Sequence, residues 1–125
     1  MITLICGLPN AGKTTYSKNY TNVIHYDEVP HITFNEHLEN TFQLIQNTSG
    51  DICIDGGFIS INERKKLLSL TNNHDTKICV WIKTPYETCV NRKGKPKFIV
   101  DSYNRKFQKP TLEEGWDEII EVVNK

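Results

Sequence analysis

The sequence predicts a three-layer α/β fold in which helices cover both faces of a mostly parallel, five-stranded sheet. Short apolar runs typical of buried strands alternate with segments of helical periodicity along nearly all of the 125 residues. A glycine-bounded segment, residues 7–14, follows the first apolar run and precedes a helical segment. Three polar residues, Asp27, Asp55 and Thr84, follow later apolar runs. Because ligands of such sheets bind at the carboxyl ends of the strands, these residues are predicted to lie at one edge.

The first half of the chain contains three predicted strands and two predicted helices. Ile2–Cys6 is an apolar run stopped by a glycine, as expected for a short buried strand. Leu38, Phe42 and Ile45 recur at helical spacing, and Gly50 ends that helix. In order, the elements are expected to be a strand at 2–6, a helix at 13–20, a strand at 23–26, a helix at 34–48 and a strand at 52–55.

The second half is marked by two capping-box patterns, each a hydroxyl residue followed three positions later by a glutamate. Ser60 precedes Glu63, and Thr84 precedes Glu87 with Pro85 at the first helical position. Both patterns predict helix starts. The remaining elements are expected to be a strand at 77–82, a loop rich in lysine and glycine at 91–96, a helix at 100–107 and a last strand at 119–123.

Length and composition indicate one globular domain spanning residues 1–125. Hydrophobic residues make up 38% and charged residues 24%, which is typical of soluble domains. No apolar run reaches the roughly 18 residues that a membrane-spanning helix needs, so no membrane partner is expected. The first residues lack the basic leader and cleavage site of a signal peptide, which favours a cytoplasmic location.

Three residue types that often carry chemistry are interpreted as structural. No two of the four cysteines form a Cys-x-x-Cys pair, so all are expected to be apolar core residues in a reducing compartment. The histidines show no metal-ligand spacing and are expected at the surface or in helix caps; they are His25, His31, His37 and His74. Both tryptophans are predicted to pack in or beside the core.

The strongest functional signal is the pattern G-x-x-x-x-G-K-[ST], which residues 7–14 match between a predicted strand and a predicted helix. Backbone N–H groups and the helix N-terminus would surround a nucleoside triphosphate. Lys13 would bridge the β- and γ-phosphates, and the Thr14 hydroxyl would bind Mg²⁺. Thr15 is a first-turn helix residue that could also touch the α-phosphate. The residues predicted to bind the nucleotide are Gly7, Asn10, Ala11, Gly12, Lys13, Thr14, Thr15 and Arg92.

Two acidic residues at predicted strand ends are candidates for chemistry. At Asp27, a carboxylate could accept the proton of an alcohol and orient it for phosphoryl transfer. An aspartate there is also a common turn or capping residue, and Glu28 beside it is expected to be solvated. Asp55 ends the third strand, where an acid often orders Mg²⁺ or its water shell. The alternative for Asp55 is a structural turn with Gly56 and Gly57.

Charge is unevenly distributed although the net charge is zero. Between residues 92 and 109 there are seven basic residues and one acid. A cation over a γ-phosphoryl group would lower the barrier to its transfer, so Arg92 is predicted to act from a short basic lid at about residues 91–98. The lysines of this run could instead bind a nucleic-acid backbone or form a solvated face.

With these residues in place, the sequence resembles the polynucleotide 5′-hydroxyl kinase-like group of P-loop kinases. The resemblance covers nearly the whole chain. It rests on residues 7–14 after a strand, on Tyr26-Asp27-Glu28 ending the next, on Asp55 followed by residues 62–68, and on residues 107–122, which read FQKPTLEEGWDEIIEV. The last of these segments is far more specific than the first.

The resemblance implies an adenylate-kinase-like P-loop NTPase fold, ATP with Mg²⁺, and transfer of the γ-phosphate to a hydroxyl. Asp27 matches the group's general base, Arg92 matches a lid arginine, and Asp55 matches the acid that ends the third strand. With Lys13, Asp27 and Arg92 form the expected catalytic set. The chain has no companion phosphatase or ligase domain, so a stand-alone minimal kinase is expected.

Two departures from the group concern the acceptor. Pro30 stands where many members have an arginine that holds a substrate phosphate, and the lid has one arginine where relatives have two. Lys95 or Lys97 could compensate. The leading hypothesis is an ATP-dependent kinase for the 5′-hydroxyl of DNA or RNA. Pro30 motivates a small-molecule, nucleoside-like kinase as the alternative, and the thin lid motivates a nucleotide-binding regulatory module with little turnover.

Overall fold

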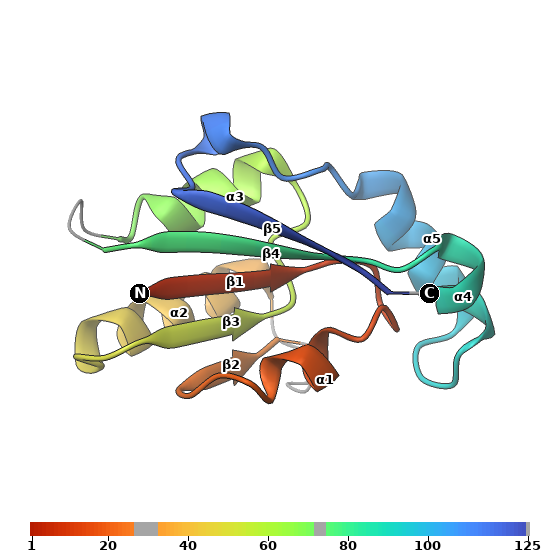
Figure 1. Ribbon diagram of the computed structural model, residues 1–125, viewed down its shortest axis with the longest axis horizontal. Coiled ribbons are helices and arrows are strands. Elements are labelled where there is room, and N and C mark those ends of the chain that lie inside the picture. Colours follow the sequence, from red (N-terminus) through yellow and green to blue (C-terminus); the bar gives the residue numbers. More distant parts are fainter. Residues whose placement is uncertain (27–32, 72–74, 125) are drawn as a thin grey trace.

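In the computed structural model, which describes residues 1–26, 33–71 and 75–124, the chain folds as the predicted three-layer α/β unit. The strands are β1 (Ile2–Cys6), β2 (Val23–His25), β3 (Ile52–Asp55), β4 (Lys77–Lys83) and β5 (Glu118–Val123). They form one parallel sheet in the order β2-β3-β1-β4-β5. β1 is central, so the loop that follows it lies in the middle of the sheet's carboxyl edge (Figure 1).

Helices cover both faces of this sheet, as parallel strands require. They are α1 (Lys13–Ser17), α2 (Phe34–Asn47), α3 (Ile61–Leu68), α4 (Tyr86–Asn91) and α5 (Lys97–Lys106), with a 3₁₀ helix, η1, at Leu112–Glu114. Leu4 belongs to the core cluster beneath α2 and α3, whereas its neighbour Ile5 belongs to the cluster beneath α1, α4 and α5. In the described ranges no helix is long and apolar enough to cross a membrane.

Two helices differ from the predicted bounds by three residues at one end. α1 ends at Ser17 rather than at residue 20, because its hydroxyl bonds to the Thr14 carbonyl at 2.7 Å and tighter three-residue hydrogen bonds follow. α5 begins at Lys97 rather than at residue 100, directly after Pro96. A 2.8 Å ion pair between Lys97 and Asp101, one turn apart, supports this first turn.

The two predicted capping boxes have different outcomes. At the start of α3 the Ser60 hydroxyl accepts from the Glu63 N–H at 3.1 Å, and the Glu63 carboxylate accepts from the Ser60 N–H at 3.3 Å, which confirms the first box. The second box is wrong. α4 begins after Pro85, and the buried Thr84 hydroxyl donates instead to the Ala11 carbonyl at 2.6 Å.

The surface position expected for the histidines is wrong for His37. Its ring is buried between Tyr26 and Phe58, with ring centroids 4.3 and 5.0 Å away. This aromatic cluster joins the end of β2 to α2. His31 and His74 lie outside the described residues. The prediction that the cysteines are core residues is confirmed, because all four are buried and free. Burial raises the pKa of Cys53 to about 12.

A buried ion pair connects α3 to the segment before β5. Arg64 is fully buried, and its Nε lies 2.7 Å from Oε1 of Glu114, which is also buried. The guanidinium also donates to the carbonyls of Phe58 and Gln108 at 3.1 and 2.6 Å. The Trp116 indole donates to the same glutamate at 3.0 Å. The distinctive closing segment of the sequence is therefore held to the core by one buried carboxylate.

We expect Glu114→Gln to lower the free energy of unfolding by about 3 kcal/mol, because it leaves the buried Arg64 guanidinium without its countercharge. Urea unfolding at neutral pH measures this loss. Glu113→Gln, at the exposed neighbouring position, is the matched control and should cost little. A cost for Glu114→Gln as small as that of the control would contradict the role of the pair.

The stabilisation by the Arg64–Glu114 pair is expected to depend on pH. Burial acts to raise the pKa of the Glu114 carboxyl, but hydrogen bonds from Arg64, Trp116 and Thr111 outweigh it and lower the pKa below its ordinary value. The stabilisation is therefore fully present above the ordinary glutamate pKa of about 4.3 and is lost as the pH falls through the lower folded value. The stability difference between wild type and Glu114→Gln should shrink in that acid range.

Candidate functional site

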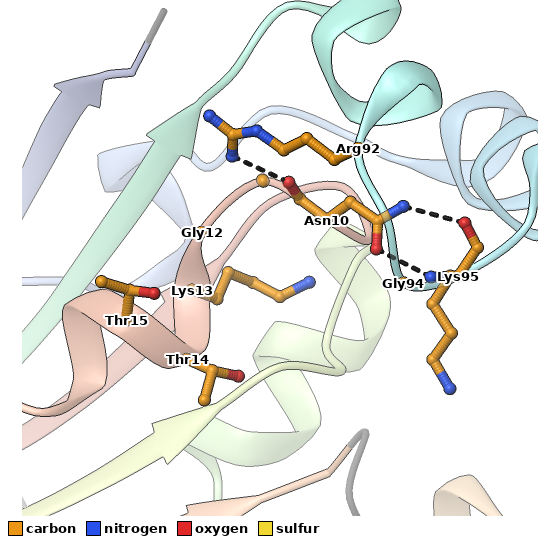
Figure 2. Close-up of a pocket in the computed structure, with 9 residues that line it drawn as sticks. Asn10, Gly12, Lys13, Thr14, Thr15, Arg92, Gly94 and Lys95 are labelled. Atoms are coloured by element: carbon orange, nitrogen blue, oxygen red, sulfur yellow. Dashed lines mark hydrogen bonds between the residues drawn. The ribbon is translucent and has the colours of Figure 1, made fainter.

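The predicted phosphate-binding loop, residues 7–14, is called the phosphate loop below. It lines a pocket of about 570 Å³ beyond the end of β1, called the phosphate pocket below after this prediction (Figure 2). One wall comes from the loop and the first turn of α1, and the other from the segment between α4 and α5. The lining residues are Asn10, Ala11, Gly12, Lys13, Thr14, Thr15, Arg92, Gly94 and Lys95. Seven of the eight residues predicted to bind nucleotide are thus together. The eighth, Gly7, supplies a carbonyl to the Lys13 ammonium at 3.0 Å.

Glycine is required in this loop for steric and conformational reasons. A Cβ on Gly7 would lie 2.8 Å from the Ile82 carbonyl oxygen in β4, which is backbone and has little freedom to move. Gly12 has φ 106°, in the left-handed region that other residues avoid, and it is the residue before α1. The two glycines let the chain turn tightly against the sheet and enter the helix directly.

Donors from distant parts of the chain hold the carbonyl oxygens of the loop. The Ala11 carbonyl accepts from the Thr84 hydroxyl at 2.6 Å and from the Asn124 amide at 2.9 Å. The Asn10 carbonyl accepts from Arg92 Nη1 at 3.0 Å. Because the C=O and N–H of a trans peptide point in opposite directions, fixing the Ala11 oxygen turns the Gly12 N–H the other way. The Ala11 N–H itself donates to the Leu8 carbonyl at 3.1 Å. Thr84 was predicted to lie at this edge, but no sequence pattern indicated that it or Asn124 would bond to the loop.

The electrostatics of the pocket favour an anion. Lys13, Arg92 and Lys95 line it, and none of the described residues that line it is acidic. The Lys13 side chain is 7% exposed, and its Nζ contacts the Gly7 and Leu8 carbonyls. Figure 2 shows this side chain extending between Arg92 and Thr14. Convergent cations in a concave site raise the local concentration of negatively charged ligands.

The segment predicted as a lid is a short loop at residues 92–96, called the basic loop below. Asn91 is the last residue of α4, and Lys97 and Phe98 are the first residues of α5. Arg92 and Lys95 line the pocket. Lys97 instead pairs with Asp101 on its own helix. The basic loop therefore contributes two cations to the pocket.

Asp55 is buried at the end of β3, next to the central strand. Its Oδ2 lies 2.7 Å from Nδ1 of His25, whereas Oδ1 has no hydrogen-bond partner among the described residues. Asp55 is not among the residues lining the phosphate pocket. Asp27, the other acid singled out in the sequence, lies outside the described residues. His25 was not predicted to take part in a site.

A second hollow, of about 490 Å³, adjoins the phosphate pocket and shares three residues with it, Gly12, Thr15 and Arg92. It extends between α1 and the end of β5, where Tyr16 and Asn124 line it. The shared residues make the two spaces direct neighbours. A ligand with a charged end in the phosphate pocket could place an uncharged part beside Tyr16.

A third hollow, of about 360 Å³, lies between β2, α2, α3 and α5 and is called the aromatic hollow below. Its lining includes four rings, those of Tyr26, Phe34, Phe58 and Tyr103. Phe34 and Phe58 meet edge to face with centroids 5.4 Å apart. Its lining also includes Glu63, whose carboxylate accepts a hydrogen bond in the α3 capping box, and Lys106. Sequence patterns did not predict this grouping, because its rings come from two helices and two connecting segments that are far apart in the sequence.

Comparison with known proteins bears on the fold. No protein-family model matches the chain, and no curated protein sequence matches it. Among solved structures, the chain is similar to the crystal structure of a fungal RNA kinase, with a TM-score of 0.69 and 12% sequence identity. The match covers 96% of this chain and 37% of that protein, so the chain spans little more than a third of its length. At this identity the similarity establishes the shared fold.

We expect Gly7→Ala to lower the free energy of unfolding by about 1–3 kcal/mol, the usual cost of forcing an extra carbon into a filled site. The Ile82 carbonyl at 2.8 Å is the obstacle. Gly50→Ala is the control, because a Cβ there meets nothing within 4 Å. Thermal and urea unfolding of both variants measure the difference. Equal stability of the two variants would show that the loop does not pack against β4 in this way.

Proposed function

We propose that the chain is an ATP-dependent kinase that transfers the γ-phosphate to a hydroxyl group, with the 5′-hydroxyl of DNA or RNA as the acceptor. The observation that carries the proposal is the phosphate pocket itself. It combines a glycine-bounded loop at the start of a helix with cations from two sides, Lys13 and Arg92. The fold shared with an RNA kinase supports the same reading.

The donor nucleotide would extend across the two adjoining hollows. Its polyphosphate would accept hydrogen bonds from the N–H groups of residues 12–14, with Lys13 reaching the β- and γ-phosphates. Arg92, held by the Asn10 carbonyl, would lie over the γ-phosphate. The base would lie beside Tyr16 and Asn124 in the adjoining hollow.

Magnesium fits the residues present at this edge of the sheet. The Thr14 side chain is exposed at the pocket, and Asp55 has one buried carboxylate oxygen with no described partner. Mg²⁺ commonly takes only one or two protein ligands and completes its shell with water and phosphate oxygens, so it needs no cluster of acids. When bound, it would neutralise charge that develops on the phosphates.

The transfer step needs a base and a charge stabiliser from this chain. The bond from the γ-phosphorus to the bridging oxygen breaks, a bond to the acceptor oxygen forms, and ADP leaves. The acceptor proton would pass to the Asp27 carboxylate, a role that rests on its position in the sequence. Lys13 and Arg92 would stabilise the negative charge on the phosphoryl oxygens during the transfer.

The aromatic hollow supports a nucleoside as the acceptor. Tyr26, which directly precedes Asp27 in the sequence, lines it together with Tyr103 and Phe34. Aromatic rings bind nucleobases by stacking without regard to base identity. The exposed Lys106 at its rim could bind the phosphate on the 3′ side of that nucleoside, a contact that a free nucleoside would lack.

An assay with labelled ATP tests the proposed function. The acceptors are 5′-hydroxyl oligonucleotides and free nucleosides, each in the presence of Mg²⁺. Label in oligonucleotides is the expected result. Label in nucleosides alone would replace the proposal with a small-molecule kinase. ATP binding without label in any acceptor would replace it with a nucleotide-binding regulatory module.

Two variants separate binding from transfer. Lys13→Ala should weaken both ATP binding and transfer, whereas Asp27→Asn should keep ATP affinity and lower transfer by about a hundredfold, the usual scale for a general base. Lys18→Ala, exposed at the end of the same short helix, is the control for Lys13. Calorimetry gives the affinities and the labelled-ATP assay gives the rates. Near-normal turnover of Asp27→Asn would remove this residue from the mechanism.

The role of the aromatic hollow as the acceptor site can be tested separately. Lys106→Ala should raise KM for an oligonucleotide about fivefold to tenfold, the scale of one lost phosphate contact, and leave KM for ATP unchanged. Tyr103→Leu should raise the same KM by removing a stacking ring. Lys65→Ala, also exposed on α3, is the control. An unchanged oligonucleotide KM in both variants would exclude the aromatic hollow as the acceptor site.

A further inference from the structure

The side chain of Asn10 joins the phosphate-binding loop to the basic loop. Its Nδ2 donates to the Lys95 carbonyl at 2.9 Å, and its Oδ1 accepts from the Lys95 N–H at 2.9 Å (Figure 2). Nδ2 also donates to the Cys89 carbonyl at 3.0 Å. Both N–H donors and the oxygen of the amide are thereby engaged. The bonds span 79 and 85 residues of sequence, so they tie two distant segments together.

The backbone on both sides is shaped for this contact. Asn10 has φ 67°, a left-handed conformation that asparagine tolerates better than most residues with a side chain. Gly94, opposite, has φ 138°, and a Cβ built on it would lie 2.5 Å from Oδ1 of Asn10. Any larger residue at 94 would push the two loops apart. The fit therefore depends on an amide at one position and a glycine at the other.

The amide contact has a direct consequence for Arg92. This arginine begins the basic loop, and its Nη1 donates to the Asn10 carbonyl at 3.0 Å. The side chain and the carbonyl of Asn10 thus hold Lys95 and Arg92, the two cations that the basic loop contributes to the pocket. All of these contacts form within the chain itself.

We propose that Asn10 is a positioning residue: it holds the basic loop against the phosphate loop, so that Arg92 faces the γ-phosphate without further ordering of the chain. The inference rests on the proposed function for its effect on transfer, because Asn10 acts through Arg92. Its structural half, an amide that closes the basic loop against the phosphate loop, stands on the three hydrogen bonds alone. Pre-ordering a catalytic loop lowers the entropic cost of reaching the reactive arrangement.

Asn10→Gly is the cleanest variant, since glycine accepts the left-handed φ and removes only the side-chain bonds. Gly94→Ala opens the same contact from the opposite side. Asn22→Gly is the matched control. Asn22 also has a left-handed φ, 51°, and its Nδ2 donates to the Asp51 carbonyl at 2.9 Å, but that bond joins β2 to β3 at the sheet's other edge.

The first readout needs no nucleotide. Hydrogen exchange of the Lys95 amide, which donates to Asn10, should become at least about tenfold faster in Asn10→Gly and Gly94→Ala, the expected change when one net hydrogen bond of ordinary strength is lost. Asn22→Gly should leave it unchanged. Unchanged Lys95 exchange in Asn10→Gly would overturn the proposal, even if the wild-type protein proves to be an active kinase.

The second readout asks whether the contact acts through Arg92. In the labelled-ATP assay, Asn10→Gly should lower kcat about tenfold while KM for ATP changes less, and it should lower kcat no further in an Arg92→Ala background. An equal loss in both backgrounds would show a role independent of Arg92 and overturn the positioning role. Absence of transfer by the wild-type protein would refute the proposed kinase and the coupling to Arg92, while the exchange result would still decide whether the amide closes the loop.

Discussion

The Ala11 carbonyl oxygen accepts hydrogen bonds from the Thr84 hydroxyl at 2.6 Å and the Asn124 amide at 2.9 Å. Thr84 follows β4, Asn124 follows β5, and Ala11 lies in the loop after β1. Hydrogen bonds to one oxygen atom therefore join the segments that follow three neighbouring strands. A peptide group fixed at its oxygen presents its N–H in the opposite direction, and this is the property that an anion site built from backbone requires. The sheet thereby determines the conformation of the loop.

The contacts that hold the closing segment are separate from the residues that line the phosphate pocket. On one face of the sheet, Arg64 and Glu114 hold the closing segment to α3. On the carboxyl edge, cations from the phosphate loop and the basic loop line one pocket, and none of the described lining residues is acidic. Cations that line one concave site raise the local concentration of negatively charged ligands.

The sequence predicted those parts of the fold that depend on local patterns. The five strands, the capping box of Ser60 and the glycine-bounded loop all follow from residues within a few positions of one another. It could not reveal that Thr84 bonds to Ala11, 73 residues away, or that Asn10 bonds to Lys95, 85 residues away, because these partners meet only through tertiary packing. The burial of His37 likewise depends on the rings of Tyr26, which follows β2, and Phe58, which lies between β3 and α3, and no periodicity indicates these contacts.

The proposed function requires that backbone amides at residues 12–14 bind a polyphosphate. The most direct measurement is an NMR titration of the labelled protein with a non-hydrolysable ATP analogue and Mg²⁺, following the amide resonances of Gly12, Lys13 and Thr14. These three resonances are expected to move early and far in the titration, as N–H groups that donate to phosphate oxygens do. Binding of the analogue that leaves them unmoved, or no binding at millimolar analogue, would contradict the proposed function.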